Sequence, residues 1–123
     1  MARIMIVDDE ESIREIFSAF LTRLGHEVAE AETGPLALAQ LELFRPHMVL
    51  LDIRMPGMDG IAVLKKIRDL HPEMPVIMVT AEMDDATGRA AVESGATDYL
   101  TKPISLGQLN THLTVHLFLE SDE

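Results

Sequence analysis

The sequence predicts an α/β protein built as (βα)5, a five-stranded parallel sheet between two layers of helices. Two observations support this. Short apolar runs alternate with longer segments of helical period, which is typical of successive βα units. The chain has 123 residues, 47% of them hydrophobic, which suits one domain with a single substantial core. Right-handed crossovers then favour a doubly wound sheet whose ligands bind at the carboxyl ends of the strands.

Five strands are expected. Residues 3–7, 47–51 and 76–80 are almost continuously apolar, so we expect them at the centre of the sheet with helices over both faces. Residues 27–31 and 97–100 are more polar and suit flanking or edge positions.

Five helices are expected, at residues 11–24, 35–44, 60–70, 84–94 and 105–119. The first has apolar residues at helical spacing and Gly25 after it as a C-cap. The helix at 84–94 offers mainly alanines to the core and contains Gly88, so little apolar area holds it in place. It is the element that we expect to move.

The last helix carries one leucine stripe that is expected to face the sheet: Leu106, Leu109, Leu113 and Leu117. Three apolar residues fall off that stripe: Val115, Phe118 and Leu119. They either are tolerated singly at the surface or extend a protein-binding face. His112 and His116 stand four apart on this helix, but no carboxylate motif accompanies them, which favours packing or exposure over metal binding.

The composition limits the function. Twenty-one acidic residues against ten basic ones give a formal charge of −11, which disfavours direct binding to nucleic acid. The absence of cysteine excludes disulfides and thiolate metal sites. No apolar run has the length of a signal peptide or a membrane span, so we expect a cytoplasmic protein without membrane contact.

Polar side chains meet at the carboxyl ends of the expected strands. Asp8 and Asp9 follow the first strand, Asp52 the third, Thr80 ends the fourth, and Lys102 follows the fifth. Singly, each could be a cap or a turn residue. Together, three carboxylates repel one another unless a cation intervenes, and an all-oxygen set points to Mg²⁺. A carboxylate beside Mg²⁺ can attack phosphorus, with the hydroxyl and the ammonium completing the charge clamp.

The segments "VDDE", "LLDIRMPGMDG", "VTA" and "DYLTKP", in that order and at these intervals, resemble the signature of response-regulator receiver domains over essentially the whole chain. The resemblance implies the strand order 2-1-3-4-5. It also implies a receiver domain at residues 1–119, followed by an acidic tail at 120–123.

The resemblance further implies a role for each residue. Asp52 is the phosphoacceptor, and Mg²⁺ is held by Asp8, Asp9, Asp52 and the backbone carbonyl of Arg54. Thr80 and Lys102 contact the phosphoryl oxygens, and Tyr99 changes rotamer with Thr80. A cis peptide is expected between Lys102 and Pro103, and Pro56, Gly57 and Gly60 form a turn close to the site.

Arg54 departs from the common pattern, in which a smaller polar residue stands two after the acceptor. One hypothesis is that Arg54 and Glu82 form an ion pair across the opening and set the rate of water attack. An exposed surface Arg is the equally weighted alternative.

The function that we expect is a signalling switch. A sensor histidine kinase or phosphotransfer protein supplies the phosphoryl group, and a downstream effector, a fused output domain or a phosphorylation-dependent homodimer reads the result. The chain catalyses only its own phosphorylation and dephosphorylation. Three alternatives carry less weight: a haloacid-dehalogenase-like phosphatase, whose second Asp is replaced here by Arg54, an unphosphorylated pseudo-receiver, and a flavodoxin-like FMN binder.

Overall fold

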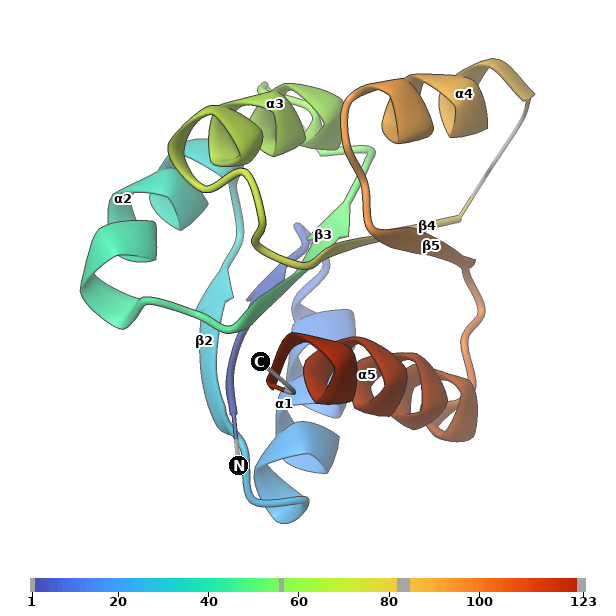
Figure 1. The fold of residues 1–123 in the computed structure, drawn as a ribbon. Coiled ribbons are helices and arrows are strands. Elements are labelled where there is room, and N and C mark those ends of the chain that lie inside the picture. Colours follow the sequence, from blue (N-terminus) through green and yellow to red (C-terminus); the bar gives the residue numbers. More distant parts are fainter. Residues whose placement is uncertain (1, 56, 82–84, 122–123) are drawn as a thin grey trace.

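The protein folds around one parallel sheet, whose strand order is β2-β1-β3-β4-β5 (Figure 1). The computed structural model describes residues 2–55, 57–81 and 85–121, with residues 85 and 118–121 described by their backbone alone. The strands are β1 (Arg3–Val7), β2 (Glu27–Ala31), β3 (Met48–Asp52), β4 (Val76–Thr80) and β5 (Asp98–Thr101). The expected fold class and strand order are therefore confirmed.

Helices cover both faces of the sheet, with α1 and α5 on one face and α2, α3 and α4 on the other (Figure 1). Their bounds are α1 (Glu11–Arg23), α2 (Gly34–Phe44), α3 (Gly60–Leu70), α4 (Asp85–Glu93) and α5 (Leu106–Ser121). None of the described helices is both long and apolar enough to pass through a lipid bilayer.

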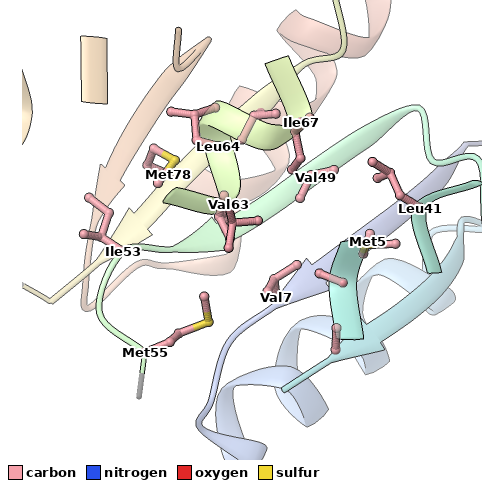
Figure 2. Packing of buried hydrophobic residues seen from close by; sticks show 14 of the residues in the cluster. Met5, Val7, Leu41, Val49, Ile53, Met55, Val63, Leu64, Ile67 and Met78 are labelled. Carbon is pink, nitrogen blue, oxygen red and sulfur yellow. The ribbon is translucent and has the colours of Figure 1, made fainter. Parts of the chain in front are cut away.

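The core is divided by the sheet into two clusters, because successive strand residues point to opposite faces. Met5 and Val7 of β1 pack toward α2 and α3, in the cluster shown in Figure 2. Ile4 and Ile6 pack toward α1 and α5. The strands β1, β3 and β4 are buried along nearly their whole length, whereas β2 and β5 keep exposed residues, as expected for edge strands.

The predicted bounds of the helices agree with the structure to within two residues. The largest difference is at α5, which continues to Ser121 instead of ending at residue 119. No Gly or Pro lies in this part of the sequence to end the helix earlier.

The leucine stripe of α5 is only partly core. Leu109 and Leu113 are fully buried, and Leu117 packs at the margin of their cluster. The prediction for Leu106 was wrong, since it is 36% exposed: it is the first residue of the helix and lines a surface pocket with Ile104. Val115 is exposed as expected, and the side chains of Phe118 and Leu119 lie outside the described part of the chain.

The helix α4 has little to hold it against the sheet. Ala91 is its one fully buried side chain among those described, and Val92 beside it is exposed. A buried methyl group contributes far less than a buried leucine. This matches the expectation that residues 84–94 form a weakly anchored helix.

The turn between β3 and α3 brings backbone against the end of β3. Gly57 has a φ of +81°, in the left-handed region that favours glycine, and Asp59 caps α3 by accepting a hydrogen bond from the Ala62 N–H at 2.9 Å. The N–H of Gly60 donates to the carbonyl of Ile53 at 2.7 Å. A Cβ at Gly60 would overlap the carbonyl oxygen of Asp52 and lie 2.7 Å from Ile53 Cα.

We therefore predict that Gly60→Ala lowers the free energy of unfolding by about 3 kcal/mol or more, because only backbone atoms could move to relieve the overlap. Gly107→Ala is the control, since the nearest atom to its Cβ is the Ser105 side chain at 3.8 Å. Its effect should be neutral or stabilising by up to about 1 kcal/mol. Equal unfolding midpoints for the two variants in urea would contradict the tight packing described at Gly60.

Candidate functional site

The polar residues expected at the carboxyl ends of the strands do come together. Ligand atoms of Asp8, Asp9 and Asp52 all lie within 4.8 Å of one another. Lys102 Nζ donates a hydrogen bond to Asp8 Oδ2 at 2.8 Å and lies 3.7 Å from Asp52 Oδ2. The parallel sheet produces this cluster, because all its strands end at the same edge.

The cluster is buried on one side and open on the other. Asp8 and Asp52 are 3% and 4% exposed, and Thr80 is fully buried, whereas Asp9 is exposed. Solvent therefore reaches the cluster at Asp9, while burial fixes the positions of the other two carboxylates.

The pKa of the Asp52 carboxyl group is strongly shifted. Burial disfavours its charged form, and the neighbouring Asp8 carboxylate adds to this, so the pKa of Asp52 is raised to about 6 from its ordinary value of 3.8. Lys102 and the backbone N–H of Arg54, which donates to Asp52 Oδ1 at 3.3 Å, oppose the shift without cancelling it. The site thus holds more negative charge than its own cation neutralises.

Lys102 is held as an ammonium. Burial alone would lower its pKa, but the hydrogen bond to Asp8 and the charges of Asp8 and Asp52 outweigh burial and raise the pKa above its ordinary value. Glu10 also accepts a hydrogen bond from Nζ, at 3.3 Å. Lys102 therefore stays a cation within reach of the buried carboxylates.

Arg14 is a positioning residue that the sequence reasoning missed. Its Nη1 donates to the carbonyl oxygen of Asp8 at 2.6 Å, and its Nε lies 3.4 Å from a carboxylate oxygen of Glu30 on β2. Arg14 thereby links the segment that carries the acidic pair to α1 and β2. The sequence offered one sign of this role: Arg14 is a cation on α1, four residues after Glu10 and close to the acidic pair.

The segment after Asp52 is anchored by apolar side chains. Ile53 and Met55 are buried in the cluster beneath α2 and α3, so the chain that leaves β3 is fixed on both sides of Arg54 (Figure 2). The Arg54 side chain is exposed. Pro56 and Glu82, assigned to the turn and to an ion pair with Arg54, lie outside the described residues.

Thr80 and Tyr99 lie on neighbouring strands. The carbonyl of Thr80 accepts a hydrogen bond from the Lys102 N–H at 2.6 Å, which joins the ends of β4 and β5. Tyr99 pairs with Met78, two residues before Thr80, and is 44% exposed. The peptide between Lys102 and Pro103 is cis, as expected.

The arrangement has a definite chemical capacity. Three carboxylates supply hard oxygen ligands of the kind that Mg²⁺ binds. One of them, Asp52, is buried beside the Lys102 ammonium, and Thr80 ends the neighbouring strand. An ammonium and a hydroxyl are groups that stabilise a transferring phosphoryl group.

Comparison with known proteins agrees with the family resemblance seen in the sequence. Residues 4–114 match the response regulator receiver domain family. The chain is 44% identical over 103 residues to the DNA-binding transcriptional regulator NtrC of Klebsiella pneumoniae, covering 84% of this chain and 22% of NtrC. It is 41% identical over 119 residues to the regulatory protein AtoC of Escherichia coli, covering 97% of this chain and 26% of AtoC. The chain thus spans about a quarter of the length of these relatives.

Solved structures agree. A CheY-like response regulator receiver domain protein from Methanospirillum hungatei superposes with a TM-score of 0.93 at 32% identity, covering 96% of this chain and 94% of that one. Receiver domains of this family accept a phosphoryl group on an aspartate and act in two-component signalling. The chain belongs to the response regulator receiver domain family.

Proposed function

We propose that Asp52 is the aspartate that accepts the phosphoryl group. The observation that carries this proposal is its position: it is the buried carboxylate at the end of a central strand, 3.7 Å from the Lys102 ammonium and grouped with Asp8 and Asp9. In the reaction, an Asp52 oxygen forms a bond to phosphorus as the bond from phosphorus to the histidine nitrogen of the donor protein breaks. The product is an acyl phosphate, which water later hydrolyses.

The carboxylates of Asp8, Asp9 and Asp52 and the backbone carbonyl of Arg54 would hold Mg²⁺. The donor set fits this ion because every ligand is an oxygen. Burial and the neighbouring Asp8 carboxylate raise the pKa of Asp52, and a cation beside Asp52 would stabilise its charged form. When bound, Mg²⁺ neutralises charge on the phosphoryl oxygens and orients the group for attack. Arg14, by holding the Asp8 carbonyl, keeps the acidic pair at the site.

Thr80 and Lys102 would receive the phosphoryl oxygens. Lys102 is already directed at the carboxylates, and the Thr80 hydroxyl is carried by the next strand in the sheet. A contact made by Thr80 only in the phosphorylated state would bias the conformational equilibrium, since a ligand shifts an equilibrium only through differential affinity.

Tyr99 and α4 would change position with the phosphorylation state and so alter the protein surface. Tyr99 is partly exposed on edge strand β5, and α4 is weakly anchored through Ala91, so both can change position at little cost. The exposed apolar residues Val92, Tyr99 and Val115 lie on α4, β5 and α5. This set forms the surface that we assign to phosphorylation-dependent binding of an effector or a second copy of the chain.

The proposed donor is a sensor histidine kinase or a phosphotransfer protein, and the proposed setting is the cytoplasm. The receiver would comprise residues 1–119, with 120–123 as a tail, and the output would come from a separate effector or a fused domain. NtrC and AtoC, which are named as regulators and are about four times as long as the match, support the second arrangement. A pseudo-receiver would lack one of the site residues. The acidic pair, Asp52 and Lys102 are all present, so the sequence does not support this alternative.

Phosphorylation of Asp52 is tested with acetyl phosphate and Mg²⁺. Intact-mass analysis should show one added phosphoryl group, which chelation of Mg²⁺ prevents and hydroxylamine removes. Asp52→Asn should gain none, while Asp69→Asn, on the exposed end of α3, should be labelled like the wild type. Labelling of Asp52→Asn to the wild-type extent would refute the assignment.

The raised pKa of Asp52 predicts that the stability of the protein depends on pH. Folded Asp52 has a pKa of about 6 and the unfolded chain about 3.8, so the folded state binds the proton more tightly. Without Mg²⁺, the contribution of Asp52 to the free energy of unfolding should therefore fall as the pH rises from about 4 to about 6. Above that range Asp52→Asn should be the more stable protein by up to about 3 kcal/mol, and the difference should shrink toward pH 4.

Urea unfolding in EDTA at pH 4 and pH 8 measures this difference, with Asp69→Asn as the control, expected to change by no more than about 0.5 kcal/mol. A difference between the wild type and Asp52→Asn that is independent of pH would rule out this electrostatic account.

The switch is tested with Thr80→Ala. This variant should still be phosphorylated, because Asp52 and Lys102 remain, but it should lose the conformational response. In the wild type, beryllofluoride with Mg²⁺ should change amide exchange in residues 85–101, and in Thr80→Ala that change should be largely absent. Identical exchange in the wild type with and without beryllofluoride would show that these residues do not form the switch.

A further inference from the structure

A second group of metal-binding side chains lies at the other end of β5. His112 Nδ1 is 2.7 Å and His116 Nε2 is 3.0 Å from the same carboxylate oxygen, Asp98 Oδ2. The ligand atoms of the three residues all lie within 4.8 Å of one another. The two histidines have the spacing of a metal site in the sequence, and Asp98 of β5 supplies the carboxylate that their sequence neighbourhood lacks.

The fold holds these side chains in place. The histidines stand four positions apart on α5, so their rings lie on one face of the helix, with centroids 6.5 Å apart and planes inclined by 29°. Asp98 Oδ1 accepts a hydrogen bond from the Tyr99 N–H at 2.8 Å, which fixes the carboxylate and turns Oδ2 toward the rings. Burial disfavours the Asp98 carboxylate, but the hydrogen bonds from His116, His112 and the Tyr99 N–H outweigh it and lower the pKa of Asp98.

The geometry points to a binding site for a divalent transition metal ion of the Zn²⁺ type, with Asp98, His112 and His116 as its three protein ligands. We propose this site as distinct from the acidic cluster that contains Asp52. Two imidazoles and one carboxylate form a ligand set that Zn²⁺ and similar ions prefer over Mg²⁺.

The distances suit such an ion after a small adjustment. Ligands about 2.1 Å from a tetrahedral ion are roughly 3.4 Å apart, so the observed 2.7 and 3.0 Å separations need to open by about 0.7 and about 0.4 Å. The side chains of His112, His116 and Asp98 are 35%, 18% and 29% exposed. An ion can therefore enter from solvent, and water can complete its coordination.

The two sites should bind independently. Asp98 begins β5 and Lys102 follows it, so the sites are separated by the length of the strand, roughly 13 Å at 3.3 Å per residue. A bound ion would link the start of β5 to α5, next to Tyr99.

The chain offers a matched control for the histidines. His71 Nε2 lies 3.0 Å from Glu42 Oε1, which is also a pair of imidazole and carboxylate at hydrogen-bond distance. It has no second histidine within the described residues of its surroundings, since metal-ligand groups of three occur only at Asp98 and at the acidic cluster in the described part of the chain.

The test is a Zn²⁺ titration by calorimetry in excess Mg²⁺, which occupies the acidic cluster if that cluster binds it. The wild type and His71→Gln should bind one Zn²⁺ with equal affinity. His112→Gln and His116→Gln should each bind it about tenfold or more weakly. Asp52→Asn should retain the wild-type affinity, which separates this site from the phosphoryl-acceptor assignment.

A second measurement needs no variant. Zn²⁺ added to the wild type should shift the amide resonances of residues 97–99 and 112–116, and Co²⁺ should give the visible absorption of an ion bound by imidazole. The inference is overturned if the folded wild type binds no Zn²⁺. It is also overturned if binding is unchanged in both histidine variants, or if it is lost in Asp52→Asn and kept in His116→Gln.

Discussion

The repulsion among buried carboxylates at the end of the sheet is the constraint on which the site depends. Asp8 and Asp52 are nearly inaccessible to solvent and Asp9 lies beside them, yet Lys102 is the one cation that contacts the cluster among the described ion pairs. Burial strengthens this repulsion because the interior screens charge less than water does. A bound cation would reduce this repulsion, which supports the proposed Mg²⁺ site.

The rest of the fold packs tightly around the acidic cluster and less tightly at α4 and β5. Central strands buried on both faces hold Asp8, Asp52 and Thr80, and the close approach of Gly60 fixes the backbone behind the acceptor. By contrast, α4 is attached through an alanine, and β5 is an edge strand. In the proposed switch, this difference in packing would allow phosphorylation at the well-packed site to move the weakly packed surface.

Much of this could be predicted from the sequence. Apolar runs located the strands because buried parallel strands have no polar face, and the ends of those strands located the site residues. The sequence could not reveal contacts that depend on two distant elements meeting. The carboxylate that joins His112 and His116 comes from β5, on another element of the fold. Arg14 is close to Asp8 in the sequence, but its position on α1 does not by itself show that the side chain turns back to the Asp8 carbonyl. Leu106 was misassigned because helical period does not show where a helix passes beyond the sheet.

The most direct test of the account is a crystal structure of the protein soaked in Mn²⁺, whose anomalous scattering locates the ion without ambiguity. The account predicts a strong peak bounded by the carboxylates of Asp8, Asp9 and Asp52, with the Lys102 ammonium displaced from Asp8. No peak at that position in well-ordered crystals, with Lys102 still bonded to Asp8, would contradict it.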